Sequence, residues 1–265
     1  MQKRDTVNPI FYFAIMLASI ILIVLGIIVF IPFSPARSDT ARIQEGTAYL
    51  LEQEAKDISS LDVQVKEKRD PSEIEGMTPW EIMDYYDTYI IGDSRVEVLY
   101  WAGIQMEHVF VEKNSTIRYL DERMEDIAAA HPANLVMSFG INDLGMYSYD
   151  PDNYWETAGE YIDELDVYIR TIREVSPGTN LYINSIIPVQ DYILDVQPRW
   201  ELIGEWNEAL KTYCLENDIV YIDADFIADE FGEFFDDDGV HFYEQVAIDA
   251  WGETIADAIV ERMTS

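Results

Sequence analysis

The chain has 265 residues, including 17 basic and 51 acidic ones, and its formal net charge at pH 7 is −34. This charge argues against binding to nucleic-acid phosphates, which requires a basic face, and it disfavours contact with an anionic membrane surface. The single cysteine, Cys214, excludes an intrachain disulfide and a cysteine-rich metal site. The length suits one sizeable α/β domain with an additional segment.

The first part of the chain predicts a membrane anchor. Residues 10–33 carry no charge, and a helix of this length can cross a hydrocarbon core of roughly 30 Å. Lys3 and Arg4 precede this stretch, so the positive-inside rule places the N-terminus in the cytoplasm and the rest of the chain outside. A cleaved signal peptide is the alternative, since small residues follow at 34–36, but its apolar region usually spans only about 7–15 residues. We therefore expect a cytoplasmic segment at 1–9, an uncleaved anchor at 10–33, an extracellular stalk at 34–77 and a globular domain at 78–265.

From residue 78 onward, helix and strand patterns alternate. Thr78, the proline after it and Glu81 together predict a capped helix start. Short apolar strands are expected at 89–91, 108–111, 134–139, 181–187 and 219–222, and helices at 116–130, 153–175, 199–216 and 243–263. Five strands separated by helices predict a parallel sheet in a doubly wound, three-layer α/β/α sandwich of flavodoxin-like topology. In such a fold the functional residues lie at the carboxyl ends of the strands.

The first of these strand ends carries a serine. Gly92 interrupts the apolar run, and a glycine there permits a sharp turn or a close approach of another group. Asp93 and Ser94 follow, and both are residue types that favour the N-cap of a helix. A serine hydroxyl at this position could attack a carbonyl, because nearby N–H groups would stabilise the resulting oxyanion. The alternative is that Asp93 or Ser94 only caps a helix.

The end of the third predicted strand carries an asparagine. Asn142 lies in the sequence Gly140-Ile-Asn-Asp, on the same edge of the predicted sheet as Ser94. Its side-chain N–H could donate to an oxyanion, since Gly140 lets the backbone come close. An ordinary turn built from Asn and Asp is the alternative.

A base for the serine is expected near the C-terminus. His241 lies in the loop between the last strand and the last helix, and Asp238 is close enough in sequence to orient its imidazole. The other histidines, His108 at a strand start and His131 at a helix end, are interpreted as structural. The acidic pair at 236–237 is interpreted as a solvated run, with a cation site or an exchanged role in the triad as the alternative.

Together, these residues resemble the SGNH hydrolase superfamily, also called GDSL esterases, over residues 85–263. The matching blocks are Gly92-Asp-Ser94, Gly140-Ile-Asn142-Asp143 and Asp238-Gly-Val-His241. The resemblance implies that Ser94 is the nucleophile, Asn142 an oxyanion donor, and Asp238 and His241 the rest of the triad. The longer run at 91–97, with Asn184-Ser-Ile-Ile-Pro188, looks like a membrane-anchored branch from Gram-positive bacteria that is associated with acyl groups on envelope polymers.

One block departs from the superfamily pattern. After the second strand the superfamily has a glycine whose N–H joins the oxyanion hole, whereas residues 111–116 contain no glycine and Asn114 is the nearest candidate. Its backbone N–H is retained, but asparagine tolerates positive φ less well than glycine.

Arg95, where many relatives have leucine, could bind a substrate anion or form an ion pair with Glu97 or a neighbour, and we favour the structural role. Among the aromatic residues, Tyr147 and Tyr149 are expected to stack on sugars and Trp206 to pack.

The resemblance implies a cell-surface serine esterase that removes acyl groups, with acetyl the expected one, from a carbohydrate without a cofactor. One alternative is an acyltransferase that modifies an envelope polymer together with a membrane acyl-carrier partner. Another is a non-catalytic envelope-binding module, which the missing glycine would favour.

Overall fold

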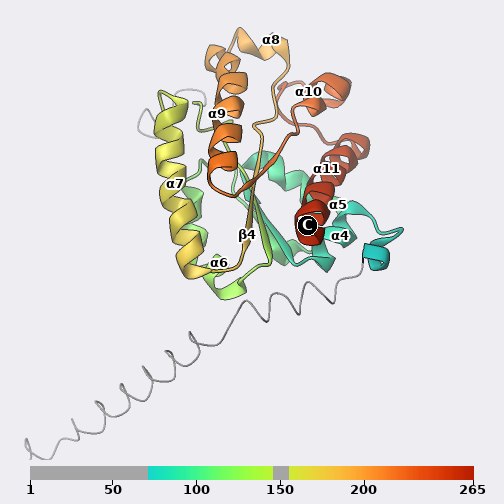
Figure 1. The fold of residues 1–265 in the computed structure, drawn as a ribbon. Helices are drawn as coiled ribbons and strands as arrows, with labels where there is room; N and C mark the ends of the chain where they lie inside the picture. Colours follow the sequence, from blue (N-terminus) through green and yellow to red (C-terminus); the bar gives the residue numbers. More distant parts are fainter. Residues whose placement is uncertain (1–70, 146–154) are drawn as a thin grey trace, which may run out of the picture. The chain divides into compact units, whose positions relative to one another are not determined.

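The computed structural model describes residues 71–145 and 155–265. The predicted anchor at 10–33, most of the predicted stalk, and the predicted sugar-stacking residues Tyr147 and Tyr149 lie outside the described residues. Within the described residues, no helix is both long and apolar enough to cross a membrane. The sheet and helices of the described residues are shown in Figure 1.

Five parallel strands form the sheet, as predicted. They are β1 (Thr88–Gly92), β2 (Val109–Val111), β3 (Asn134–Ser138), β4 (Asn180–Asn184) and β5 (Val220–Ile222), in the spatial order β2-β1-β3-β4-β5. This order is that of a doubly wound sheet, in which the strand order reverses beside β1. β3 is buried along its whole length, as expected for a strand covered on both faces.

The register aligns the strand ends that carry the candidate residues. Gly92 at the end of β1 lies opposite Val111 of β2 and Ser138 of β3. The loops that follow these three strands therefore leave the sheet at the same level. The predicted strand at 181–187 ends at Asn184, because the N–H of Ile186 bonds to the Asn207 side chain (2.8 Å) instead of a neighbouring strand.

Eight α-helices lie among the described residues. They are α4 (Pro79–Tyr85), α5 (Leu99–Ala102), α6 (Tyr119–Ala130), α7 (Ala158–Val175), α8 (Asp191–Leu194), α9 (Ile203–Glu216), α10 (Phe226–Glu230) and α11 (Gln245–Thr264). The capping box predicted at Thr78 and Glu81 is present. Short 3₁₀ segments occur at Pro71–Ile74, Ser94–Val98, Met106–His108, Pro198–Leu202 and Gly232–Phe234.

Three helices begin three to five residues later than predicted. The helix predicted from 116 begins at Tyr119, because the preceding residues form a turn in which Tyr119 N–H donates to Thr116 O. The helix predicted from 153 begins at Ala158, where Thr157 and Glu160 form a second capping box. The helix predicted from 199 is divided into a 3₁₀ segment and α9.

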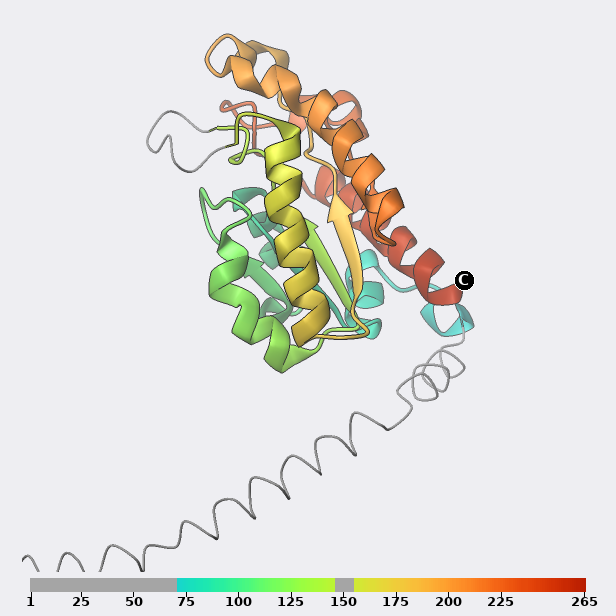
Figure 2. The same cartoon turned by 60° about the vertical axis from the view of Figure 1, so that its left-hand side comes forward.

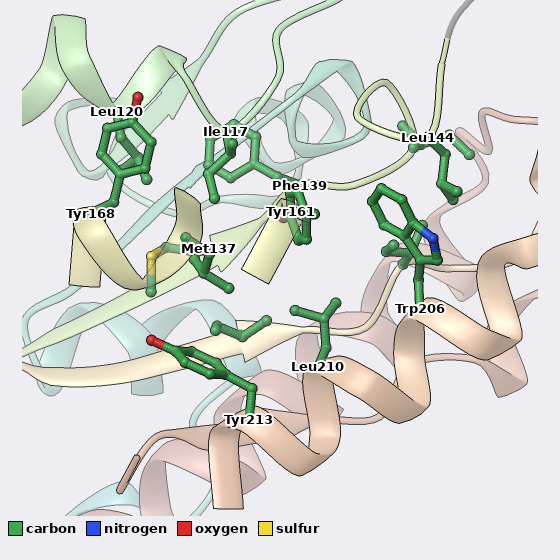
Figure 3. Packing of buried hydrophobic residues seen from close by; sticks show 14 of the residues in the cluster. Ile117, Leu120, Met137, Phe139, Leu144, Tyr161, Tyr168, Trp206, Leu210 and Tyr213 are labelled. Atoms are coloured by element: carbon green, nitrogen blue, oxygen red, sulfur yellow. The ribbon is translucent and has the colours of Figure 1, made fainter. Parts of the chain in front are cut away.

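The helices form two layers around the sheet (Figures 1 and 2). One hydrophobic cluster joins the sheet to α6, α7 and α9, and the other joins it to α4, α5 and α11. Figure 3 shows the first cluster, where Met137 of β3 lies among residues of α7 and α9. Trp206 is buried there and stacks on Tyr161 with a centroid distance of 5.1 Å, which confirms its predicted packing role.

Candidate active site

The turn after β1 presents Ser94. A Cβ on Gly92 would lie 2.3 Å from Ser138 O, so only glycine fits this contact between β1 and β3. The carboxylate of Asp93 then accepts a hydrogen bond from Arg95 N–H (3.0 Å) and caps the 3₁₀ helix that begins at Ser94. The capping role therefore belongs to Asp93, and the hydroxyl of Ser94 remains available for another partner.

That partner is His241. Ser94 Oγ lies 2.8 Å from His241 Nε2, and His241 Nδ1 lies 2.6 Å from Asp238 Oδ2. The three side chains thus form one continuous hydrogen-bonded chain between residues that are 147 positions apart in sequence. This is the geometry that a serine nucleophile, a histidine base and an orienting carboxylate require.

The loop around Asp238 fixes the carboxylate in place. Asp238 Oδ1 accepts hydrogen bonds from the N–H groups of Val240 (2.8 Å) and His241 (2.9 Å), and Gly239 turns the chain with φ +67°. Partial burial alone would raise the pKa of Asp238, but these N–H groups and the imidazole outweigh it and lower the pKa below its ordinary value. An ionised Asp238 favours a proton on Nδ1 of His241, which leaves Nε2 free to accept the proton of Ser94.

Two asparagines lie beside the serine. Asn142 donates one side-chain N–H to Ser115 O (2.8 Å), and an amide carries a second N–H that this bond does not use. Gly140 shapes this block: its φ is +127°, and a Cβ there would lie 2.4 Å from the Ile186 side chain. Asn142 and Asn114 line the same cavity as Ser94, whereas Gly140 acts through the backbone conformation.

Asn114 takes the left-handed conformation that glycine usually provides. Its φ is +61°, in the region where asparagine is the most tolerated residue after glycine. The loop after β2 therefore reaches the cavity although it lacks the superfamily glycine. In the described part of the chain, no backbone acceptor binds the N–H of Asn114. That N–H is a candidate third donor to an oxyanion.

Two buried carboxyl groups, those of Asp93 and Asp143, lie in the loops that follow β1 and β3. Asp143 accepts a hydrogen bond from Ile117 N–H (2.9 Å), which ties the loop after β3 to the segment before α6. Burial raises the pKa of Asp143 to about 8 and that of Asp93 to about 6. Asp143 therefore retains its proton through most of the neutral range.

Arg95 has a structural position. Its side chain is buried and donates to Ile187 O, in the loop after β4. Of the two partners considered, Glu97 or a neighbour, Glu97 binds Lys113 instead (2.9 Å), while the buried Arg95 lies within electrostatic range of its neighbour Asp93. Arg95 does not line the cavity that contains Ser94, so the structure gives no support for its binding a substrate anion.

The cavity next to Ser94 has a volume of about 210 Å³. Its polar residues are Ser94, Asn114, Asn142, Asp238 and His241, and its apolar walls are Ile141, Ile193, Trp200 and Val240. Trp200 Nε1 donates to Ile141 O (3.0 Å), which fixes one wall to the loop after β3. The sequence analysis did not identify Ile193, because α8 has only four residues and shows no helical periodicity.

The remaining candidates lie outside this cavity. His108 lies against Tyr89 (ring centroids 4.2 Å apart), and His131 Nδ1 lies 3.2 Å from Ser176 Oγ, as expected for structural histidines. Burial raises the pKa of Cys214 to about 12, which suits a structural thiol. The described residues contain no cluster of His, Cys, Asp or Glu that could hold a metal ion.

Comparison with known proteins identifies the family. The sequence model of the GDSL-like lipase/acylhydrolase family matches residues 95–245, which is more than half of the chain and begins one residue after Ser94. No protein of curated function matches. The fold resembles a protein assigned as a GDSL-like lipase from Parabacteroides merdae, with a TM-score of 0.54 and 15% identity over 65% of this chain and 94% of that one.

Two further structures share the fold. One is a protein assigned as an acylhydrolase from Bacteroides fragilis (TM-score 0.51, 14% identity, 74% of this chain and 100% of that one). The other is an acetylxylan esterase from Geobacillus stearothermophilus (TM-score 0.50, 16% identity, 67% of this chain and 94% of that one). At these identities the similarity concerns the fold, and the family match carries the assignment. The chain belongs to the GDSL-like lipase/acylhydrolase family and is a serine ester hydrolase.

Proposed function

We propose that this protein is an extracytoplasmic esterase that removes acyl groups, acetyl foremost, from a cell-envelope carbohydrate through a Ser-His-Asp acyl-enzyme mechanism. The observation that carries the proposal is the hydrogen-bonded chain from Ser94 through His241 to Asp238, which opens into the cavity. The similarity in fold to an acetylxylan esterase supports a carbohydrate ester as substrate. The predicted anchor at 10–33 supports the location outside the membrane.

The first half of the mechanism forms the acyl-enzyme. Ser94 Oγ attacks the ester carbonyl while its proton passes to Nε2 of His241, and the negative charge moves to the carbonyl oxygen. The donors for that oxygen are the N–H groups of Ser94 and Asn114 and the unused side-chain N–H of Asn142. The tetrahedral intermediate then breaks its bond to the alcohol oxygen, which takes the proton from His241. Asp238 stabilises the imidazolium throughout.

The second half releases the acid. A water molecule gives a proton to His241 Nε2 and attacks the acyl carbon, and Ser94 leaves with the proton that the imidazole returns. The free acid and the original serine result. Because Ser94 and His241 act as one unit, Ser94→Ala and His241→Ala should each remove nearly all turnover, and the double variant should be little worse than either single variant.

Acyl transfer to a polymer hydroxyl is the second candidate. The predicted anchor favours it, because the anchor would hold the domain beside a membrane acyl donor. The two activities differ in the second nucleophile, water or an acceptor hydroxyl. The absence of the superfamily glycine after β2 favoured a non-catalytic module. Asn114 adopts φ +61° and lines the cavity, so this absence no longer favours that alternative.

Product analysis tests the proposal. The full-length protein is incubated with an acetylated polysaccharide, with and without a deacetylated sugar acceptor. Free acetate in both reactions supports hydrolysis, whereas acetylated acceptor without free acetate supports transfer. Release that persists in folded Ser94→Ala would contradict both.

Protease added to intact cells should digest the chain beyond about residue 40, since the span needs roughly 20 residues. Protection of the domain would contradict the location.

A further inference from the structure

We propose that Tyr243, together with the Glu97–Lys113 ion pair, forms a subsite for the neutral sugar ring that carries the ester. The inference rests on the esterase function proposed above and concerns only the alcohol half of the substrate. It assigns a binding role to an aromatic residue that the sequence analysis had placed at the start of a helix.

Tyr243 is exposed next to the catalytic histidine. Its ring lies nearly parallel to that of His241, with a centroid distance of 6.2 Å and an interplanar angle of 13°. The residue between them, Phe242, is buried and packs edge-on against Trp251. Tyr243 itself is 53% exposed, so it contributes little to the core. The segment thus turns one aromatic ring inward and presents another at the surface beside the imidazole.

The chemistry of the reaction places the alcohol near this ring. His241 Nε2 must protonate the leaving oxygen, so that oxygen comes within hydrogen-bonding distance of the imidazole. A sugar attached to the same oxygen then lies beside the imidazole, where Tyr243 presents an exposed aromatic ring. Tyrosine offers an apolar face and a polar hydroxyl, and both are suited to a pyranose ring. The acyl half is suited to the apolar walls of the cavity.

A polar group lies close to the same ring. Lys113 Nζ binds Glu97 Oε2 at 2.9 Å, and the lysine side chain is 65% exposed. Glu97 belongs to the 3₁₀ helix that begins at Ser94, and Lys113 directly precedes Asn114. The charges of Glu97 and Lys113 both act on the Tyr243 hydroxyl, so the ion pair lies within electrostatic range of that ring. A carboxylate accepts from sugar hydroxyls and an ammonium donates to them.

The surrounding charge selects a neutral sugar. Asp236 and Asp238 also act on Tyr243. Among the described residues whose charges act on this ring, the one cation is Lys113, and Glu97 already neutralises it. An anionic sugar such as a uronic acid would meet net negative charge here. The ligand class is therefore an uncharged O-acylated pyranose.

The test compares two esters with the same acyl group. One is an acetylated neutral xylo-oligosaccharide, and the other is ethyl acetate, whose alcohol is too short to reach Tyr243. The measured quantity is kcat/KM for the oligosaccharide ester divided by kcat/KM for ethyl acetate. Tyr243→Ala should lower this ratio about 3- to 10-fold, as expected for the loss of one aromatic contact. Tyr243→Phe keeps the ring and should restore most of the ratio. Lys113→Met should lower it by a smaller factor.

Trp101→Ala provides the matched control. Trp101 is an aromatic residue on α5 that is 77% exposed and does not line the cavity, so its loss should leave the ratio unchanged. An unchanged ratio in folded Tyr243→Ala would overturn the subsite while leaving the esterase intact. An equal loss on both esters would also overturn it, because Tyr243 would then act through His241. If the wild type cleaves neither ester, the proposed function itself fails.

Discussion

Replacement of Asn142 should have two separate effects, a loss of turnover and a loss of folding stability. In Asn142→Ala the oxyanion loses a side-chain donor, and Ser115 O loses the hydrogen bond that Asn142 Nδ2 donates at 2.8 Å. Removal of one oxyanion donor typically lowers turnover about 100- to 1000-fold, or roughly 2.7–4 kcal/mol of barrier. Loss of the bond to a partly buried carbonyl costs about 1–3 kcal/mol of folding free energy. For a domain of this size, each kcal/mol lowers Tm by about 2–4 °C.

Steady-state kinetics and thermal melting measure the two losses independently. The variant should lower kcat for ethyl acetate with little change in KM, because the donor acts mainly in the transition state. Asn217→Ala is a matched control, since Asn217 donates a comparable side-chain bond to Tyr213 O (2.9 Å) at the end of α9, away from the cavity. It should lose similar stability and keep full activity. Wild-type kcat in folded Asn142→Ala would refute the role of Asn142 in the oxyanion hole.

Three other variants probe the same site. Asn114→Gly should keep activity within about 3-fold, because glycine retains the N–H and accepts φ +61°, whereas a 100-fold loss in a kinetic assay would show that the side chain is needed. Asp238→Asn should leave more turnover than Ser94→Ala, since Asp238 orients rather than reacts, and equal losses would contradict this. Burial raises the pKa of Asp143 to about 8, so the folded chain holds a proton that the unfolded chain releases above about pH 4, and stability falls as pH rises to 8. Between pH 5 and pH 8, the free energy of unfolding of Asp143→Asn, measured by urea titration, should therefore rise by about 2–4 kcal/mol relative to that of wild type. Parallel pH profiles of the two unfolding free energies would contradict the assignment.

The positions that the sequence predicted well are those fixed by local chemistry. Gly92 and Gly140 mark the sharp turns after β1 and β3, where a Cβ would collide with the neighbouring chain. Apolar runs before them identified the strands, and parallel strands bring their carboxyl ends to one edge. Ser94 and His241 could therefore be assigned to one site before their 2.8 Å contact was seen.

The positions that the sequence did not predict depend on long-range packing. The pairing of Glu97 with Lys113, rather than with Arg95, depends on how the loop after β2 folds back on the 3₁₀ helix. The left-handed conformation of Asn114 is set by the same loop. Ile193 belongs to a helix too short to show a periodic pattern, and Tyr243, predicted at the start of a helix from 243, lies before α11, which begins at Gln245. Their places at the site depend on the three-dimensional fold.

Covalent labelling with a fluorophosphonate probe tests the central claim, that Ser94 is the nucleophile activated by His241. The account predicts one probe molecule per chain, located on Ser94 by peptide mass analysis. It also predicts no labelling of folded Ser94→Ala and much slower labelling of His241→Ala, because the hydroxyl then lacks its base. Labelling of another residue, or labelling of Ser94→Ala at the wild-type rate, would contradict the account.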